Sequence, residues 1–161
     1  MPLTNRVKPR IGDLIEISTP KGLSYAHFTH KHETPPRYGS LIRVLPGIFP
    51  ERPTDFAELV RGQPLFSTFF PLGSACQRNI VRVVASEPIP LHTVTFPTFR
   101  SSRRDRSGKR VGTWFLWDGQ RKWNAERLTE QQLRDYPPLG IWNDTLLIER
   151  IIAGWRNEHD S

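Results

Sequence analysis

Apolar and polar positions alternate over several short stretches of this chain, with the period of two that is typical of half-buried β-strands. We therefore predict strands over residues 12–17, 23–29, 38–45, 79–85 and 91–99. The first two join through Thr19-Pro20-Lys21-Gly22, where proline and glycine suit a tight turn. A loop rich in His and Pro is predicted over residues 30–37. The apolar run at 65–70 fits either a strand or a buried turn, and Pro97 suggests that the 91–99 strand is an edge or bulged strand.

The segment 114–123 has the sharpest local pattern. Two aromatic-containing runs, WFLW and QRKW, flank Asp118-Gly119, a pair that suits a two-residue type I′ hairpin turn. A turn of that length fixes the register of the two strands, and it places Trp114 opposite Trp123. We therefore predict a cross-strand tryptophan pair on one face of the sheet.

One longer helix is predicted over residues 141–155. Asn143 or Asp144 can cap its start, because either side-chain oxygen can accept from the N–H groups that the first turn leaves unpaired. Apolar residues then recur at helical spacing and form one stripe: Leu147, Ile148, Ile151 and Trp155. A stripe that ends in tryptophan needs a broad apolar surface, so we expect this helix to pack on the sheet.

Two short helices complete the predicted elements. Thr54 can cap one that ends at Gly62, and Thr129 with Gln132 fits a capping box for another, which Pro137-Pro138 stops. Together the elements predict a β-rich α+β fold. Its centre is expected to be a small curved or barrel-like antiparallel sheet, with short helices and a C-terminal helix packed on it.

Length and cysteine content narrow the class of protein. A chain of 161 residues can bury its own core, so we predict a single domain over residues 1–161 with the core at about 10–155. Cys76 is the only cysteine and has no partner for an internal disulfide. The N-terminal segment is basic without a following apolar stretch, and no apolar run approaches the roughly 18 residues of a membrane span. We therefore expect a cytoplasmic protein with no membrane partner.

The net charge of +7 is concentrated in one segment. Between Arg100 and Arg110 there are six basic residues and one acid, so +5 of the +7 lies there. Serine and glycine are interspersed with the arginines, which predicts a flexible basic loop over residues 100–112. Three interpretations stay open: a solvated loop, a contact with a protein partner, or phosphate contacts to a nucleic acid whose bases stack on Trp114 and Trp117.

Few residues suggest catalytic or metal chemistry. His27, His30 and His32 resemble a metal-binding cluster, but on a continuous strand His27 points away from the other two, so we favour a solvated loop and expect no metal or cofactor. Cys76 could be a nucleophile beside a histidine, although a lone cysteine is more often a small buried apolar residue. The sequence has no phosphate loop, no G-x-S-x-G and no evident carboxylate pair. An enzyme is therefore the class that it favours least.

Two stretches in the N-terminal half suggest a family resemblance. Residues 11–17 read I-G-D-x-I-E-I, Tyr25 follows, and residues 38–45 read Y-G-x-L-I-R-V-L. With the Trp-rich later half, these motifs resemble the bacterial immunity protein 26 family over about residues 10–155. The resemblance implies a mostly β, cytoplasmic protein that is encoded beside a polymorphic toxin and neutralises it by direct binding. It implies no catalytic or ligand-binding residues.

The sequence thus supports two hypotheses of binding. The first is a non-enzymatic immunity protein whose partner is its cognate toxin. Because this chain is basic, the toxin should present an acidic or neutral contact face, or the contact should be made by aromatic and apolar residues. Candidate partner-binding residues are Arg103, Arg104, Arg106, Lys109 and Arg110, together with Trp117 and Trp142 if these two are exposed rather than part of the core. The alternative is a small β-barrel nucleic-acid-binding module that uses the basic segment 100–110.

Overall fold

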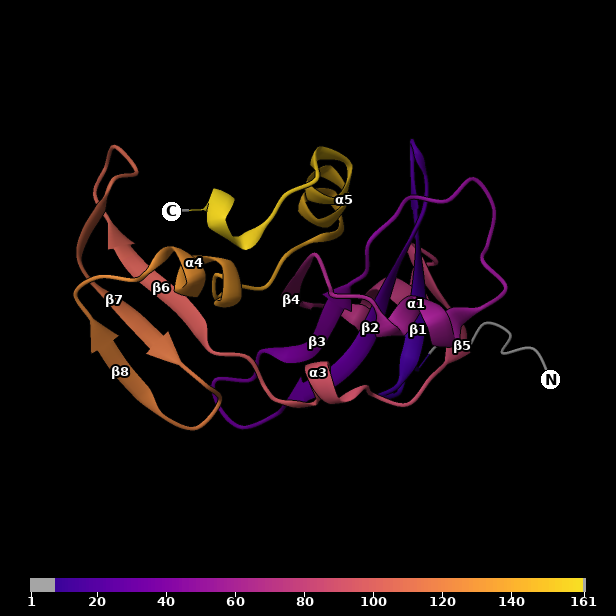
Figure 1. The fold of residues 1–161 in the computed structure, drawn as a ribbon, viewed down its shortest axis with the longest axis horizontal. Coiled ribbons are helices and arrows are strands. Elements are labelled where there is room, and N and C mark those ends of the chain that lie inside the picture. The colour runs from indigo at the N-terminus through magenta and orange to yellow at the C-terminus, as the bar shows by residue number, and fades with distance from the viewer. Residues whose placement is uncertain (1–7, 161) are drawn as a thin grey trace. The chain divides into compact units, whose positions relative to one another are not determined.

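The computed structural model describes residues 8–160 and divides them into two compact units (Figure 1). Unit 1 comprises residues 8–95 and 140–155, and unit 2 comprises residues 96–139 and 156–160. The single domain predicted over residues 1–161 stays a prediction, and residues 1–7 and 161 of it lie outside the described range. None of the described helices is both long and apolar enough to cross a membrane.

Unit 1 is built on a five-stranded antiparallel sheet with the order β4-β3-β2-β1-β5. Its described elements are β1 (Asp13–Thr19), β2 (Gly22–His32), β3 (Gly39–Val44), α1 (Phe56–Arg61), β4 (Phe66–Phe70), α2 (Leu72–Gln77), β5 (Val81–Ser86), α3 (Leu91–Val94) and α5 (Asp144–Ala153). β4 and β5 are the two edges, so the sheet is open. The barrel-like closure considered from the sequence does not occur.

Helix α5 packs on this sheet, as predicted. The Asn143 side chain accepts from the Leu146 N–H and caps the helix, and Gly154 ends it in the left-handed conformation, which glycine adopts without strain. Leu147 and Ile151 are buried in the main core with residues of β1 to β5 and α2. Trp155, the last residue of the predicted stripe, belongs to the same core.

Unit 2 is built on a three-stranded antiparallel sheet with the order β6-β7-β8. Its described elements are β6 (Phe99–Arg104), β7 (Arg110–Trp117), β8 (Lys122–Ala125), α4 (Glu130–Asp135) and the short 3₁₀ helix η1 (Asn157–His159). The predicted capping box is present: the Thr129 hydroxyl accepts from the Gln132 N–H, and the Gln132 side chain accepts from the Thr129 N–H. The two sheets and their short helices confirm a β-rich α+β fold, which is arranged as two open sheets rather than one.

Several predicted boundaries were wrong. β2 continues through His32, so the predicted loop at 30–37 begins as strand. Residues 91–94 form the helical turn α3, not a strand, since Pro90 precedes them and Thr95 returns to extended backbone before Pro97. Asp55, not Thr54, caps α1 by accepting from the Glu58 N–H.

The register of the 114–123 hairpin also differs from the prediction. Leu116 lies opposite Trp123, and Trp114 lies opposite Ala125, so the directly opposed tryptophan pair is wrong. The loop has four residues because the Asp118 carboxylate accepts from the N–H groups of both Gln120 (3.0 Å) and Arg121 (2.7 Å). This side-chain turn replaces the two-residue turn that Asp-Gly suggested.

Candidate functional site

The basic segment is a β-hairpin rather than the predicted loop. β6 and β7 pair in antiparallel register, with Arg103 opposite Val111 and Arg104 opposite Arg110. The turn between them is organised by the Asp105 carboxylate, which accepts from the Ser107 hydroxyl (2.6 Å) and from the backbone N–H of Lys109 (3.0 Å). These hydrogen bonds to the charged form hold the pKa of Asp105 below its ordinary value. Arg103, Arg104 and Arg110 are therefore presented at fixed strand positions, and Arg106 lies in the turn.

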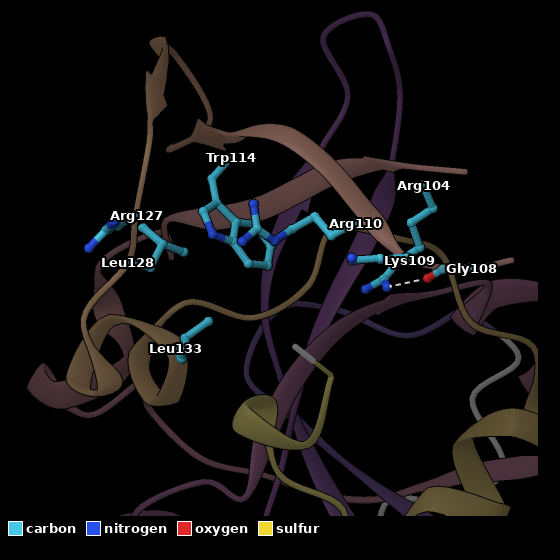
Figure 2. Close-up of a pocket in the computed structure, with 8 residues that line it drawn as sticks. All are labelled: Arg104, Gly108, Lys109, Arg110, Trp114, Arg127, Leu128 and Leu133. Carbon is cyan, nitrogen blue, oxygen red and sulfur yellow. Dashed lines mark hydrogen bonds between the residues drawn. The ribbon is translucent and has the colours of Figure 1, made fainter. Parts of the chain in front are cut away.

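A pocket of about 660 Å³ lies on one face of unit 2. Its lining residues come from β6, the hairpin turn, β7, the segment after β8, and α4: Arg104, Gly108, Lys109, Arg110, Trp114, Arg127, Leu128 and Leu133. Figure 2 shows Arg104 and Lys109 close together beyond Arg110, with Arg127 and Leu128 on the other side of Trp114. Four of the described lining residues are cationic and none is acidic. The pocket therefore favours an anion.

Two of the four cations, Arg104 and Arg110, donate to backbone carbonyl oxygens. Arg104 Nη1 donates to the Gly108 carbonyl oxygen at 2.8 Å, and Arg110 Nη1 donates to that of Gly112 at 3.0 Å. The Arg110 guanidinium also lies 4.5 Å from the centre of the Trp114 ring, a cation–π contact. One carboxylate is near, since Asp160 lies 3.5 Å from Arg104 Nη2. These contacts already restrict the Arg104 and Arg110 side chains, so binding of a ligand would cost less of their conformational entropy.

The other two cations are less engaged. Within residues 8–160, neither the Lys109 ammonium nor the Arg127 guanidinium has a hydrogen-bond or ion-pair partner. Both residues are exposed. Their donors can therefore contact an external anion with little rearrangement of the protein.

Arg100, at the start of the basic segment, has a structural role. Only 2% of its surface is exposed. Its guanidinium donates to the carbonyl oxygens of Tyr136 (2.9 Å), Asn157 and Asp160, and it lies 5.2 Å from the centre of the Trp114 ring. Its charge thus ties the C-terminal η1 region to the sheet of unit 2 and is not part of the exposed cationic surface.

The remaining candidate residues lie elsewhere. Arg103 shares the opposite sheet face with Val111 and Phe115, and its guanidinium lies 5.9 Å from the Phe115 ring centre. Arg106 is exposed in the turn and does not line the pocket. Trp117 is buried against Phe96 and Phe99 in unit 2, and Trp142 is in the core of unit 1. Both tryptophans were named as partner-binding residues only if exposed, and both are buried.

Sequence reasoning missed three of the eight residues that line the pocket. Arg127, Leu128 and Leu133 were not named, because their approach to Arg110 depends on the pairing of β7 with β8 and on the position of α4. A local signal did exist. Arg127 and Leu128 stand directly before the predicted cap Thr129, so a hairpin ending near residue 125 brings them back toward the start of β7.

The histidines and the cysteine have structural surroundings. His27 Nε2 lies 2.9 Å from the Glu87 carbonyl oxygen and 3.1 Å from that of Gly12, and His30 Nε2 lies 2.9 Å from that of Val94. Burial lowers the pKa of both imidazoles. Cys76 is buried in the core of unit 1, which raises its pKa to about 11. Over residues 8–160, no group of three or more His, Cys, Asp or Glu is placed to hold a metal ion.

A charged cluster in unit 1 joins the buried residues Glu16 and Tyr25 to the half-exposed Arg52. Arg52 donates to both carboxylate oxygens of Glu16, at 2.7 and 3.1 Å, and the Tyr25 hydroxyl donates to one of them at 2.8 Å. Burial opposes ionisation of Glu16, but the hydrogen bonds and charge of Arg52 and the hydroxyl of Tyr25 outweigh it, so the pKa of Glu16 is lowered. The cluster links β1, β2 and the segment before α1, and we regard it as structural.

Comparison of the chain with protein-family models, with curated proteins and with solved structures found no match.

Proposed function

We propose that this protein neutralises a toxin by binding it stoichiometrically, and that the pocket face of unit 2 forms the contact. The observation that carries this proposal is the grouping of Arg104, Lys109, Arg110 and Arg127 around one pocket, with none of the described lining residues acidic. The motif resemblance in residues 11–17 and 38–45 supports the immunity class.

The charge of this face specifies the partner. Like charges within one pocket repel each other, so an acidic surface on the toxin gains energy by entering it. Such complementarity mainly accelerates association, because long-range attraction guides the encounter before contacts form. The partner is therefore expected to present Asp and Glu side chains rather than the basic surface of a nuclease.

A nucleic-acid-binding module is the second candidate, favoured by the same four cations. However, bases have little access to Trp114 and Trp117 for stacking, since these side chains are only 5% and 8% exposed. A nucleic acid would then contact the pocket cations through its phosphates. That mode has little sequence preference and weakens steeply with salt.

Co-expression with the product of the adjacent gene tests the proposal. Survival of cells that carry the toxin, together with a one-to-one complex after purification, is the expected result. Toxicity without rescue and without a complex would contradict it. A rise in anisotropy of a labelled oligonucleotide at low salt, lost at high salt, would then favour the nucleic-acid module.

A further inference from the structure

The pocket of unit 2 has two chemically different sides. Lys109 and Arg110 supply N–H donors at one side, whereas Leu128 and Leu133 supply apolar surface at the other, where Arg127 also lies (Figure 2). A flat interface with an acidic protein would not require such a hollow. Its volume of about 660 Å³ lies within the range of roughly 300–1,000 Å³ that holds small molecules.

The cationic side suits a phosphate group better than a single carboxylate. Lys109 offers three donors and Arg110 offers five, of which the Gly112 contact uses one. Arg104, on the neighbouring strand, adds a third positive charge, which its ion pair with Asp160 offsets in part. A phosphate carries up to two negative charges and three oxygens, so it can contact several of these donors at once.

The apolar side suits a flat ring. Leu133 projects from α4, and Leu128 precedes the helix cap, so the two side chains come from separate segments of the chain. The Trp114 ring is not free for stacking, because Arg110 lies 4.5 Å from its centre and Arg100 5.2 Å. A ring in the pocket would therefore contact Leu128, Leu133 and the Arg110 guanidinium rather than the Trp114 indole.

We propose that this pocket binds a nucleotide, with its phosphates on Lys109, Arg110 and Arg104 and its base against Leu128 and Leu133. The proposal goes beyond toxin binding and uses the same pocket. It requires only the isolated protein, so its failure leaves the toxin contact intact. Conversely, if co-expression does not rescue cells from the toxin, calorimetry still tests nucleotide binding independently.

Calorimetry of the whole protein with ADP, inorganic phosphate and adenosine at low salt tests this. ADP is expected to bind at least about tenfold more tightly than phosphate, equivalent to about 1.4 kcal/mol from the second phosphate, the ribose and the base together, and adenosine is expected not to bind. No saturation by ADP up to about 1 mM would overturn the proposal. So would equal affinity for ADP and phosphate, which would indicate an anion site alone.

Variants assign the binding to this pocket. Lys109→Gln removes an exposed ammonium with no described side-chain partner, and we expect about a threefold to tenfold loss of ADP affinity with the fold unchanged by circular dichroism. Leu133→Ala should weaken ADP but not phosphate. The matched control Lys21→Gln removes an exposed charge from unit 1 and should leave ADP binding unchanged. An equal loss in Lys109→Gln and Lys21→Gln would show non-specific attraction and overturn the assignment.

Discussion

Replacing Arg100 with Met is expected to destabilise unit 2 selectively. The buried guanidinium donates to three backbone carbonyl oxygens, those of Tyr136, Asn157 and Asp160. Each hydrogen bond from a charged donor contributes about 1.5–3 kcal/mol, and each buried oxygen left without a donor costs about 1–3 kcal/mol. Release of a buried charge offsets part of that loss. We therefore expect Arg100→Met to lower the free energy of unfolding by about 3 kcal/mol.

Urea unfolding, followed by tryptophan fluorescence and circular dichroism, measures this loss. Hydrogen exchange locates it, since the Arg100 backbone accepts from the Leu139 N–H, and protection should fall over residues 134–139 and 156–160. Arg103→Met is the control, because it removes an exposed arginine from the same strand and should change stability by less than about 0.5 kcal/mol. A loss below about 1 kcal/mol in Arg100→Met, or equal losses in both variants, would refute the structural role of Arg100.

Three further predictions concern unit 1. Burial lowers the pKa of His27, so the unfolded chain binds the proton before the folded protein does as the pH falls below about 6.5. The free energy of unfolding should therefore decline on acidification, by at most about 1.4 kcal/mol per pH unit for this group. Urea unfolding at pH 7.5 and 5.5 should show this decline, and a smaller one in His27→Gln. The lowered pKa of Glu16 contributes stability that is present above about pH 4.5 and lost on acidification through the folded-state value, so Glu16→Gln should cost about 1–2 kcal/mol at pH 7 and much less near pH 3. With its pKa raised to about 11, Cys76 should react with a thiol reagent at pH 8 at least about 100-fold more slowly than in the urea-unfolded chain.

Elements with local signals were predictable from the sequence. The Asn143 cap, the Leu147 and Ile151 stripe and the Thr129 capping box each depend on residues within one or two turns of the chain. The alternating strands at 12–17 and 38–45 likewise follow from one apolar face. In all of these, the competing conformations would expose apolar side chains or leave N–H groups unpaired.

Features that depend on long-range pairing were not predictable. The segment 100–112 is polar and carries serine and glycine, which favours a loop by composition; its strand conformation depends on β7 and on the buried anchor Arg100, whose oxygen partners are 36 to 60 residues away. The side chain of Asp118 changed the hairpin register by capping two N–H groups. The pocket was likewise visible only in part, since three of its eight lining residues, Arg127, Leu128 and Leu133, lie after β8 on two further segments of the chain.

The association rate between this protein and the product of the adjacent gene tests the central claim most directly. A variant with Arg104, Lys109, Arg110 and Arg127 changed to Gln is compared with a control in which four exposed cations of unit 1 are changed: Lys8, Lys21, Arg37 and Arg78. Both variants lose the same charge. Stopped-flow measurements at two salt concentrations are expected to show about a tenfold or greater slowing and a flatter salt dependence in the pocket variant only. Equal rates in the two variants would contradict the assignment of the pocket face as the binding site.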